Sequence, residues 1–196
     1  MDRERIDSSG VVNATLAEIY DGRAHRRYGL SHVTQRLHAV QSGALARGQG
    51  LPATLVVAAL LHDIGHMVHD LGEHPAADGI DDRHEIVAAQ WLQRYFGPAV
   101  TEPIRLHVAA KRYLCAAEPG YFERLSRDSV ESLALQGGPM SREEMRAFET
   151  EGFWREAVAL RRIDDAAKEP RGPSPAFSSF SEEIDEAVRQ SRATPR

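Results

Sequence analysis

The segment ATLVVAALLHDIGH, at residues 53–66, constrains the fold of this chain more than any other. It is apolar nearly all round, so a helix formed here must lie inside the protein. Pro52 stands where a proline favours a helix start, because its missing N–H is not needed there. The buried helix ends in an ionisable pair, His62 and Asp63. Burying a carboxylate beside an imidazole is costly without a partner, and a metal ion is the usual partner.

Apolar residues recur at helical spacing through most of the chain, and the alternation typical of strands is hard to find. A Gly/Pro/Asp loop is expected at 70–79. The predicted helices lie near 11–20, 32–47, 53–66, 81–96, 99–114, 126–135, 141–150 and 153–168. A chain of 196 residues is suited to one core. We therefore expect an all-α protein, a single bundle of about eight to ten helices.

The chain's C-terminal part has a different character, with the Pro-rich run PRGPSPAF after Glu169. Such a run is typical of a linker. We place the catalytic core at 1–169. Residues 170–196 are expected to form a linker with a short amphipathic helix or a loose end, and no separate domain.

Charge and composition exclude several classes of partner. The net charge of -5 gives no field that would hold nucleic acid or an anionic membrane. No apolar run approaches the roughly 20 residues that span a bilayer, and the start MDRERIDSSG lacks a signal-peptide core. Cys115 is the only cysteine, so an internal disulfide is impossible and the cytoplasm is the expected compartment. The oligomeric state has no signature here.

Histidines gather around the apolar helix, six of the nine lying between residues 62 and 107. The further candidates for metal ligands lie on other predicted helices: His38, His84, His107 and Asp164. Each one alone is more often a hydrogen-bonded core residue than a ligand. Their joint occurrence on separate helices, together with His62 and Asp63, favours a metal site.

The order H…HD…H…H…D resembles the HD-domain superfamily of metal-dependent enzymes, over roughly residues 28 to 168. The resemblance implies that two metal ions are held, with Asp63 between them. The residues that match its ligand pattern are His38, His62, Asp63, His84, His107 and Asp164. Imidazole and carboxylate ligands without thiolate suit iron or manganese better than structural zinc. Most of the superfamily hydrolyses phosphate esters, and a smaller branch uses two irons to activate dioxygen.

Three segments resemble that smaller branch: HVAAKRYL, LQGGPM and the QRLHA context of His38. They are similar to HD-domain oxygenases of phosphonate degradation, which split the carbon–phosphorus bond of 1-hydroxyphosphonates. The resemblance implies a mixed-valent Fe(II)/Fe(III) pair, dioxygen and a small phosphonate as reactants, and phosphate with a carboxylic acid as products. It places the phosphonate at His66, Lys111, Ser129, Ser132 and Arg161.

Helical spacing supports this placement. Lys111 follows His107 by four residues, His66 follows His62 by four, and Arg161 precedes Asp164 by three, so each cation shares a helix face with a ligand. The remaining basic residues considered, Arg112, Arg162 and Lys168, are expected to be solvated charges.

The other end of the substrate is less determined. Tyr28 matches a tyrosine that, in the aminated version of the family, occupies the open iron position until substrate arrives. Ser31 stands where that version has a glutamate that meets a primary ammonium. Its absence favours a 1-hydroxy-2-(trimethylammonio)ethylphosphonate, giving glycine betaine, because a trimethylammonium group has no N–H to donate. The alternatives are 2-amino-1-hydroxyethylphosphonate, giving glycine, and a Ser31 that merely caps the helix at 32–47.

Two other functions stay open. A metal-dependent phosphohydrolase acting on a phosphomonoester or nucleotide could use the same anion donors. A ligand sensor that retained its metals would bind without turnover.

Overall fold

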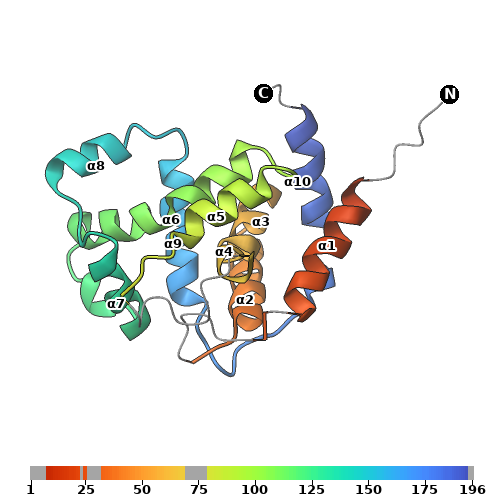
Figure 1. Cartoon of the computed structure of the whole chain (residues 1–196), viewed down its shortest axis with the longest axis horizontal. Coiled ribbons are helices and arrows are strands. Elements are labelled where there is room, and N and C mark those ends of the chain that lie inside the picture. Colours follow the sequence, from red (N-terminus) through yellow and green to blue (C-terminus); the bar gives the residue numbers. More distant parts are fainter. Residues whose placement is uncertain (1–7, 23, 26–31, 69–78, 194–196) are drawn as a thin grey trace.

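The computed structural model describes residues 8–22, 24–25, 32–68 and 79–193. Within these ranges the chain forms ten α-helices and two short 3₁₀ helices, without a strand. Figure 1 shows α1 (Ser8–Gly22) beside α10 (Ser181–Ala193) at one end of the molecule, and α7 (Arg127–Leu135) with α8 (Arg142–Phe148) at the other. The all-α prediction is confirmed. In the described part of the chain, no helix is both long enough and apolar enough to cross a bilayer.

Helix α3 (Ala53–Leu61) is the centre of the bundle, as its apolar sequence predicts. Eight of its nine residues are buried. The helices that pack around it are α2 (Gln35–Gly48), α6 (Pro98–Ala117), α9 (Trp154–Ala166) and α10. The phenol of Tyr20, on α1, donates a 3.0 Å hydrogen bond to the carbonyl of Leu60, so α1 also holds the C-terminal turn of α3. The segment that carries His62 is therefore fixed in the core.

The helix predicted over 53–66 is wrong in its last turn. Helix α3 ends at Leu61, and a separate four-residue helix, α4 (Gly65–Val68), follows. Between them the N–H groups of Ile64, His66 and Met67 donate to carbonyls three residues back, not four. This tighter winding turns His66 away from the face that His62 occupies.

Helix α2 begins later than its pattern predicts. Thr34 is its N-cap, and the Thr34 hydroxyl accepts a 3.2 Å hydrogen bond from the Leu37 amide. The N-cap position of this helix is therefore residue 34. Ser31 itself and Tyr28 lie outside the described residues, as do residues 70–78 of the predicted loop.

Helix α5 (His84–Leu92) is shorter at both ends than the predicted 81–96. Its start is set by Arg83, whose backbone has φ 48 and ψ 38, in the left-handed region that no helix can continue through. Helices α7 and α8 are capped by serine: Ser126 is the N-cap of α7, and Ser141 is the N-cap of α8, with a reciprocal contact to Glu144. Helix α6 carries both His107 and Lys111 and packs along α9.

The segment after Pro170 fills part of the core. The ring of Phe177 stacks on Tyr20 with centroids 4.7 Å apart, and Phe180 is fully buried against Gly43 of α2. A methyl group on Gly43 would meet the Phe180 ring at 2.8 Å, so this glycine makes room for it. Helix α10 buries Ile184 and its neighbours in the same apolar cluster as α3. Of the two forms expected for this tail, the structure shows the amphipathic helix.

Candidate metal centre and cationic cluster

The first group of predicted ligands meets where α2, α3 and α9 converge. The Nε2 atoms of His38 and His62 lie 3.2 Å apart, and the Asp164 Oδ1 atom lies 3.2 Å from the first and 3.8 Å from the second. All three side chains are buried. This set, which we call cluster 1, has the composition and the spacing to hold a metal ion.

A second group lies beside it, at the start of α5 and the middle of α6. The Nε2 atoms of His84 and His107 are again 3.2 Å apart. The Asp63 Oδ1 atom lies 3.6 Å from the first of these nitrogens and 3.9 Å from the second. Asp63, His84 and His107 form cluster 2, which could also hold a metal ion.

The carboxylate of Asp63 reaches both clusters. Its Oδ1 lies 3.4 Å from His62 Nε2, and its Oδ2 lies 3.6 Å from His38 Nε2, while Oδ1 also faces cluster 2. One carboxylate between two imidazole pairs is the arrangement that a bridging ligand requires. The geometry therefore fits the predicted dinuclear site, with Asp63 as the shared residue.

The four imidazole rings share one orientation relative to the clusters: Nδ1 faces outward and Nε2 faces the clusters. Nδ1 of His38 donates to the Ala167 carbonyl, Nδ1 of His62 to the Ala59 carbonyl, and Nδ1 of His107 to the Ile104 carbonyl. These three distances are 2.7 to 2.9 Å. Nδ1 of His84 donates instead to the Asp82 carboxylate at 2.9 Å. These acceptors keep a proton on Nδ1, so Nε2 is the atom through which each ring would bind a metal ion.

Two ring nitrogens that face each other at 3.2 Å need a proton or a metal ion between them. Metal–nitrogen bonds of about 2.1 Å at right angles place two ligand nitrogens roughly 3 Å apart. Both pairs match this spacing, and no thiolate is present among the described neighbours. The residues therefore fit a pair of ions that prefer imidazole and carboxylate ligands.

The electrostatics of the clusters also favour cations. Burial would raise the pKa of Asp63, but the charges of His62, His66 and His84 lower it well below its usual range. Burial likewise opposes ionisation of Asp164, and the charge of Arg161 lowers its pKa all the same. For His84, burial lowers the pKa, while the hydrogen bond that it donates to Asp82 and the charge of Asp63 raise it, to about 9. Two carboxylates thus stay ionised in the core and attract a proton or a metal ion.

His66 lies beside cluster 2, not beside His62 as its spacing predicts. Its ring stacks on that of His84, with centroids 4.0 Å apart and an interplanar angle of 21°. Its Nδ1 lies 2.6 Å from an oxygen of Asp82. The tight turn between α3 and α4 is the cause, because it carries His66 across to the start of α5.

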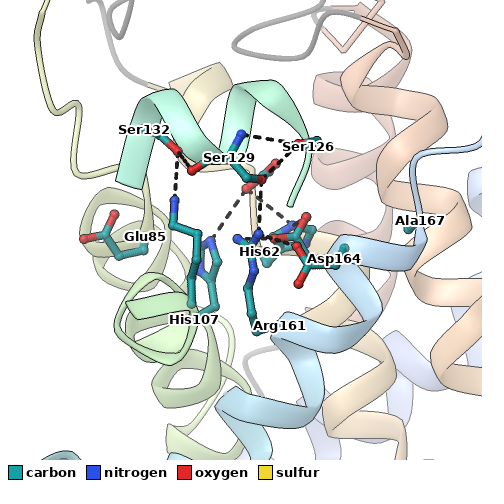
Figure 2. Close-up of polar contacts among 12 residues, drawn as sticks. His62, Glu85, His107, Ser126, Ser129, Ser132, Arg161, Asp164 and Ala167 are labelled. Carbon is teal, nitrogen blue, oxygen red and sulfur yellow. Dashed lines mark hydrogen bonds and ion pairs between the residues drawn. The ribbon is translucent and has the colours of Figure 1, made fainter. Parts of the chain in front are cut away.

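Basic side chains gather between α6, α9 and α7, on one side of the clusters. Lys111 Nζ donates to the Ser132 hydroxyl at 2.8 Å, and Arg161 Nη2 donates to the Ser129 hydroxyl at 3.2 Å. Figure 2 shows the two serines on α7, facing the side chains of His107, Arg161 and His62 below them. The cationic cluster, as we name it, is Lys111, Arg161 and Lys168 with Ser129 and Ser132.

The cationic cluster adjoins cluster 1 through Asp164. Arg161 Nη1 lies 2.7 Å from Asp164 Oδ2, and Lys168 Nζ lies 3.1 Å from Oδ1. Lys111 is only 2% exposed, and burial together with the nearby Arg161 lowers its pKa to about 7. An anion brought to these donors would relieve the repulsion among them.

Lys168 was expected to be a solvated charge, and that prediction is wrong. Its ammonium contacts Asp164 and lies 3.4 Å from the Ser129 hydroxyl. Lys168 follows Asp164 by four residues, the spacing that also relates Lys111 to His107, so helical spacing already favoured the ligand's face. The lysine count was a second signal: of the 24 lysine and arginine residues only two are lysines, Lys111 and Lys168, and both lie here.

Two further residues were missed by the sequence reasoning. The Tyr121 hydroxyl accepts a 3.3 Å hydrogen bond from Arg161 Nε and donates to Asp165, which also pairs with Arg161. They hold the guanidinium in place. The LQGGPM segment has a related role, because Arg112 donates from Nε to the Gly138 carbonyl at 2.8 Å and ties the end of α7 to α6.

Comparison with known proteins agrees with this geometry. The family model for the HD domain matches residues 36–149. A [1-hydroxy-2-(trimethylamino)ethyl]phosphonate dioxygenase (glycine-betaine-forming) from Leisingera caerulea is 39% identical over 91% of each chain. A hydroxymethylphosphonate dioxygenase from Gimesia maris is 45% identical over 81% of this chain and 80% of its own. An uncharacterized protein of Acanthamoeba polyphaga mimivirus is 31% identical over 79% of this chain and 71% of its own. The resemblance drawn from the sequence is thereby confirmed: the chain belongs to the HD-domain family, in the group that contains these phosphonate dioxygenases.

Proposed function

We propose that this chain uses dioxygen to cleave the carbon–phosphorus bond of a 1-hydroxyphosphonate. The observation that carries the proposal is the Asp63 carboxylate, which lies within 3.9 Å of imidazole nitrogens from both clusters. A dinuclear site that adjoins a cationic cluster suits an oxidation carried out on a small dianion. The two named relatives, both phosphonate dioxygenases, support the same reaction.

The reaction balances with dioxygen as the only oxidant. One C–H bond and the carbon–phosphorus bond at carbon 1 break, and both oxygen atoms are incorporated. A carboxylic acid and phosphate are the products, so carbon 1 is oxidised while dioxygen is reduced. The trimethylammonio substrate gives glycine betaine, the amino substrate gives glycine, and hydroxymethylphosphonate gives formate.

The cofactor in this proposal is a pair of iron ions, Fe(II) and Fe(III). When bound, they supply dioxygen activation and a Lewis acid for the substrate's 1-hydroxyl. Cluster 1 would hold one ion and cluster 2 the other, with Asp63 shared. The outward hydrogen bonds of the four imidazoles fix their Nε2 atoms for this role.

The chain's own residues would bind and orient the phosphonate. Lys111 and Arg161 would offer charge-assisted donors to its oxygens, and Ser129 a hydroxyl donor. Arg161 contacts both Ser129 and the predicted metal ligand Asp164, so these donors adjoin cluster 1. Since the pKa of Lys111 is about 7 in the unliganded protein, a bound dianion would favour its charged form and draw a proton onto it. Holding the anion here positions carbon 1 for oxidation.

For the other end of the substrate, the trimethylammonio group is our first choice. Ser31 replaces the glutamate suited to a primary ammonium, and the Leisingera caerulea relative is named for the trimethylated compound. Hydroxymethylphosphonate is the second candidate, because the relative named for it is 45% identical to this chain. The amino compound ranks third.

An oxygen-uptake assay tests the proposal. The iron-loaded protein is given each of the three hydroxyphosphonates, and dioxygen consumption is measured together with phosphate release. We expect equal amounts of both, and the highest kcat/KM with the trimethylated compound. Phosphate release that continues unchanged under strict anaerobiosis would instead establish a hydrolase. Its substrate would then be sought by assaying phosphate release from phosphomonoesters.

A further inference from the structure

The Asp82 carboxylate contacts two histidines with different predicted roles. Its Oδ1 accepts a 2.9 Å hydrogen bond from Nδ1 of His84, a residue of cluster 2. Its Oδ2 lies 2.6 Å from Nδ1 of His66, a residue predicted to bind the substrate. These distances are those of charge-assisted hydrogen bonds. Two ligand atoms on one metal ion would stand roughly 3 Å apart, so the 2.6 Å contact argues against a third ion here.

The backbone is built to bring the three residues together. Arg83 adopts the left-handed conformation, which is uncommon for a residue with a side chain, and it folds the Asp82 carboxylate back onto His84. The His84 amide also lies 3.3 Å from Asp82 Oδ1. On the other side, Gly65 lets α4 approach α5 closely: a Cβ at residue 65 would lie 2.0 Å from the His84 carbonyl oxygen. This approach places His66 on the His84 ring.

Asp82 faces the same ring nitrogen in both histidines. The planes of His66 and His84 are within 21° of parallel, and both Nδ1 atoms face the Asp82 carboxylate. Nε2 of His84 points into cluster 2, 3.2 Å from His107 Nε2. Since Nδ1 of His66 is turned to Asp82, the predicted contact of His66 with the substrate would use its Nε2 atom.

We propose that Asp82 is a positioning residue that sets the Nδ1–H tautomer and the orientation of both His84 and His66. Through His84 it prepares the second metal position, and through His66 it directs a nitrogen toward the substrate beside that metal. One carboxylate thereby couples the metal centre to substrate binding. The inference rests on the proposed function, since it concerns the metal that cluster 2 would hold.

Replacing Asp82 with asparagine exposes this role without changing the shape of the side chain. An amide has one acceptor and one donor, so it can accept from only one of the two histidines. The ring that faces the NH₂ group must offer an unprotonated Nδ1 and carry its proton on Nε2. For His84 that proton would stand where the metal binds. For His66 it would change what the substrate meets.

The first experiment is an anaerobic titration of the metal-free protein with Fe(II), in the wild type and in Asp82→Asn. Loss of a carboxylate that orients a ligand typically weakens metal affinity about 10- to 100-fold. We expect that loss for one ion per chain, while the other ion binds as in the wild type. Asp81→Asn is the matched control, because Asp81 is exposed and contacts only the Arg83 amide among the contacts described. It should bind both ions normally.

The second experiment separates the two arms with His66→Ala. This variant should keep both Fe(II) affinities, because His84 retains Asp82, but its KM for the hydroxyphosphonate should rise. In a double-mutant cycle, Asp82→Asn should raise KM less in the His66→Ala background than in the wild type. All variants are assayed at saturating Fe(II), so that incomplete metal loading does not lower the measured kcat.

The outcomes are distinct. Two ions bound equally well by Asp82→Asn and Asp81→Asn would overturn the role of Asp82 and leave the proposed function standing. Strictly additive effects on KM would overturn the arm through His66. A wild-type chain that binds fewer than two ions would overturn the proposed function, and this inference with it.

Discussion

Replacing Lys111 with methionine should stabilise the substrate-free enzyme while it weakens phosphonate binding. Lys111 is 2% exposed, and burial with the charge of Arg161 lowers its pKa from 10.5 to about 7. That change corresponds to roughly 5 kcal/mol against the charged ammonium in the folded state. Methionine fills a similar volume without charge. Since it also loses the hydrogen bond to Ser132, we expect a gain of about 1–4 kcal/mol at pH 7.

The pH dependence follows from the direction of the shift. Below pH 7 the ammonium is charged in both the folded and the unfolded chain, so its full cost is present. As the pH rises from 7 toward 10.5 the folded protein holds Lys111 neutral, and the cost falls away. The advantage of the methionine variant should therefore shrink across this window.

Thermal unfolding at pH 7 and pH 9.5 measures both effects. For a chain of this size, about 1 kcal/mol shifts Tm by roughly 2–4 °C. Lys168→Met is the control, because Lys168 lies 3.1 Å from Asp164 and its loss removes a favourable partner, so it should give no gain. In the activity assay, Lys111→Met should raise KM about 10- to 100-fold, the value of a lost charge-assisted hydrogen bond. A methionine variant that is less stable than the wild type at pH 7, or equally advantaged at both pH values, would refute this reasoning.

Three further variants probe the metal centre and the core. Asp63→Ala should lose both ions along with activity, and retention of two irons per chain, measured by elemental analysis, would contradict the bridging role. Gly65→Ala places a methyl 2.0 Å from the His84 carbonyl oxygen, so denaturant unfolding should show a loss of about 1–3 kcal/mol, together with weakened binding of one ion. Phe180→Ala empties a fully buried site and should cost about 3–5 kcal/mol by the same measurement, whereas an unchanged midpoint would separate the C-terminal segment from the core.

The sequence predicts those parts of the site that regular helices carry. His107 and Lys111 share α6, and Arg161 and Asp164 share α9, so four-residue and three-residue spacings give their relation correctly. The apolar run of α3 likewise reveals its burial. Their role as ligands or substrate contacts stays a prediction, but their proximity is visible in the pattern because a helix repeats at fixed intervals.

His66, which was misplaced, and Asp82, which was missed, lie where the chain leaves that regularity. His66 follows a tight turn, and Asp82 precedes a left-handed Arg83. At such points the direction of the chain depends on packing with distant segments, as Gly65 against His84 shows. Tyr121 was missed for a related reason, since it contacts Arg161 across the fold. Asp165 and Lys168, in contrast, follow Arg161 and Asp164 by four residues each, so regular helical spacing already placed them near these residues.

The confinement of lysine to the cationic cluster has a practical consequence. Since the chain's only lysines are Lys111 and Lys168, the reagents that acylate amines have few targets beyond these two and the α-amino group. Apart from the α-amino group, any amine that couples to a sensor surface or a dye would therefore belong to the proposed substrate site. Conjugation through exposed carboxylates avoids the cluster, whereas the half-buried Cys115 thiol lies only one helical turn after Lys111 on α6.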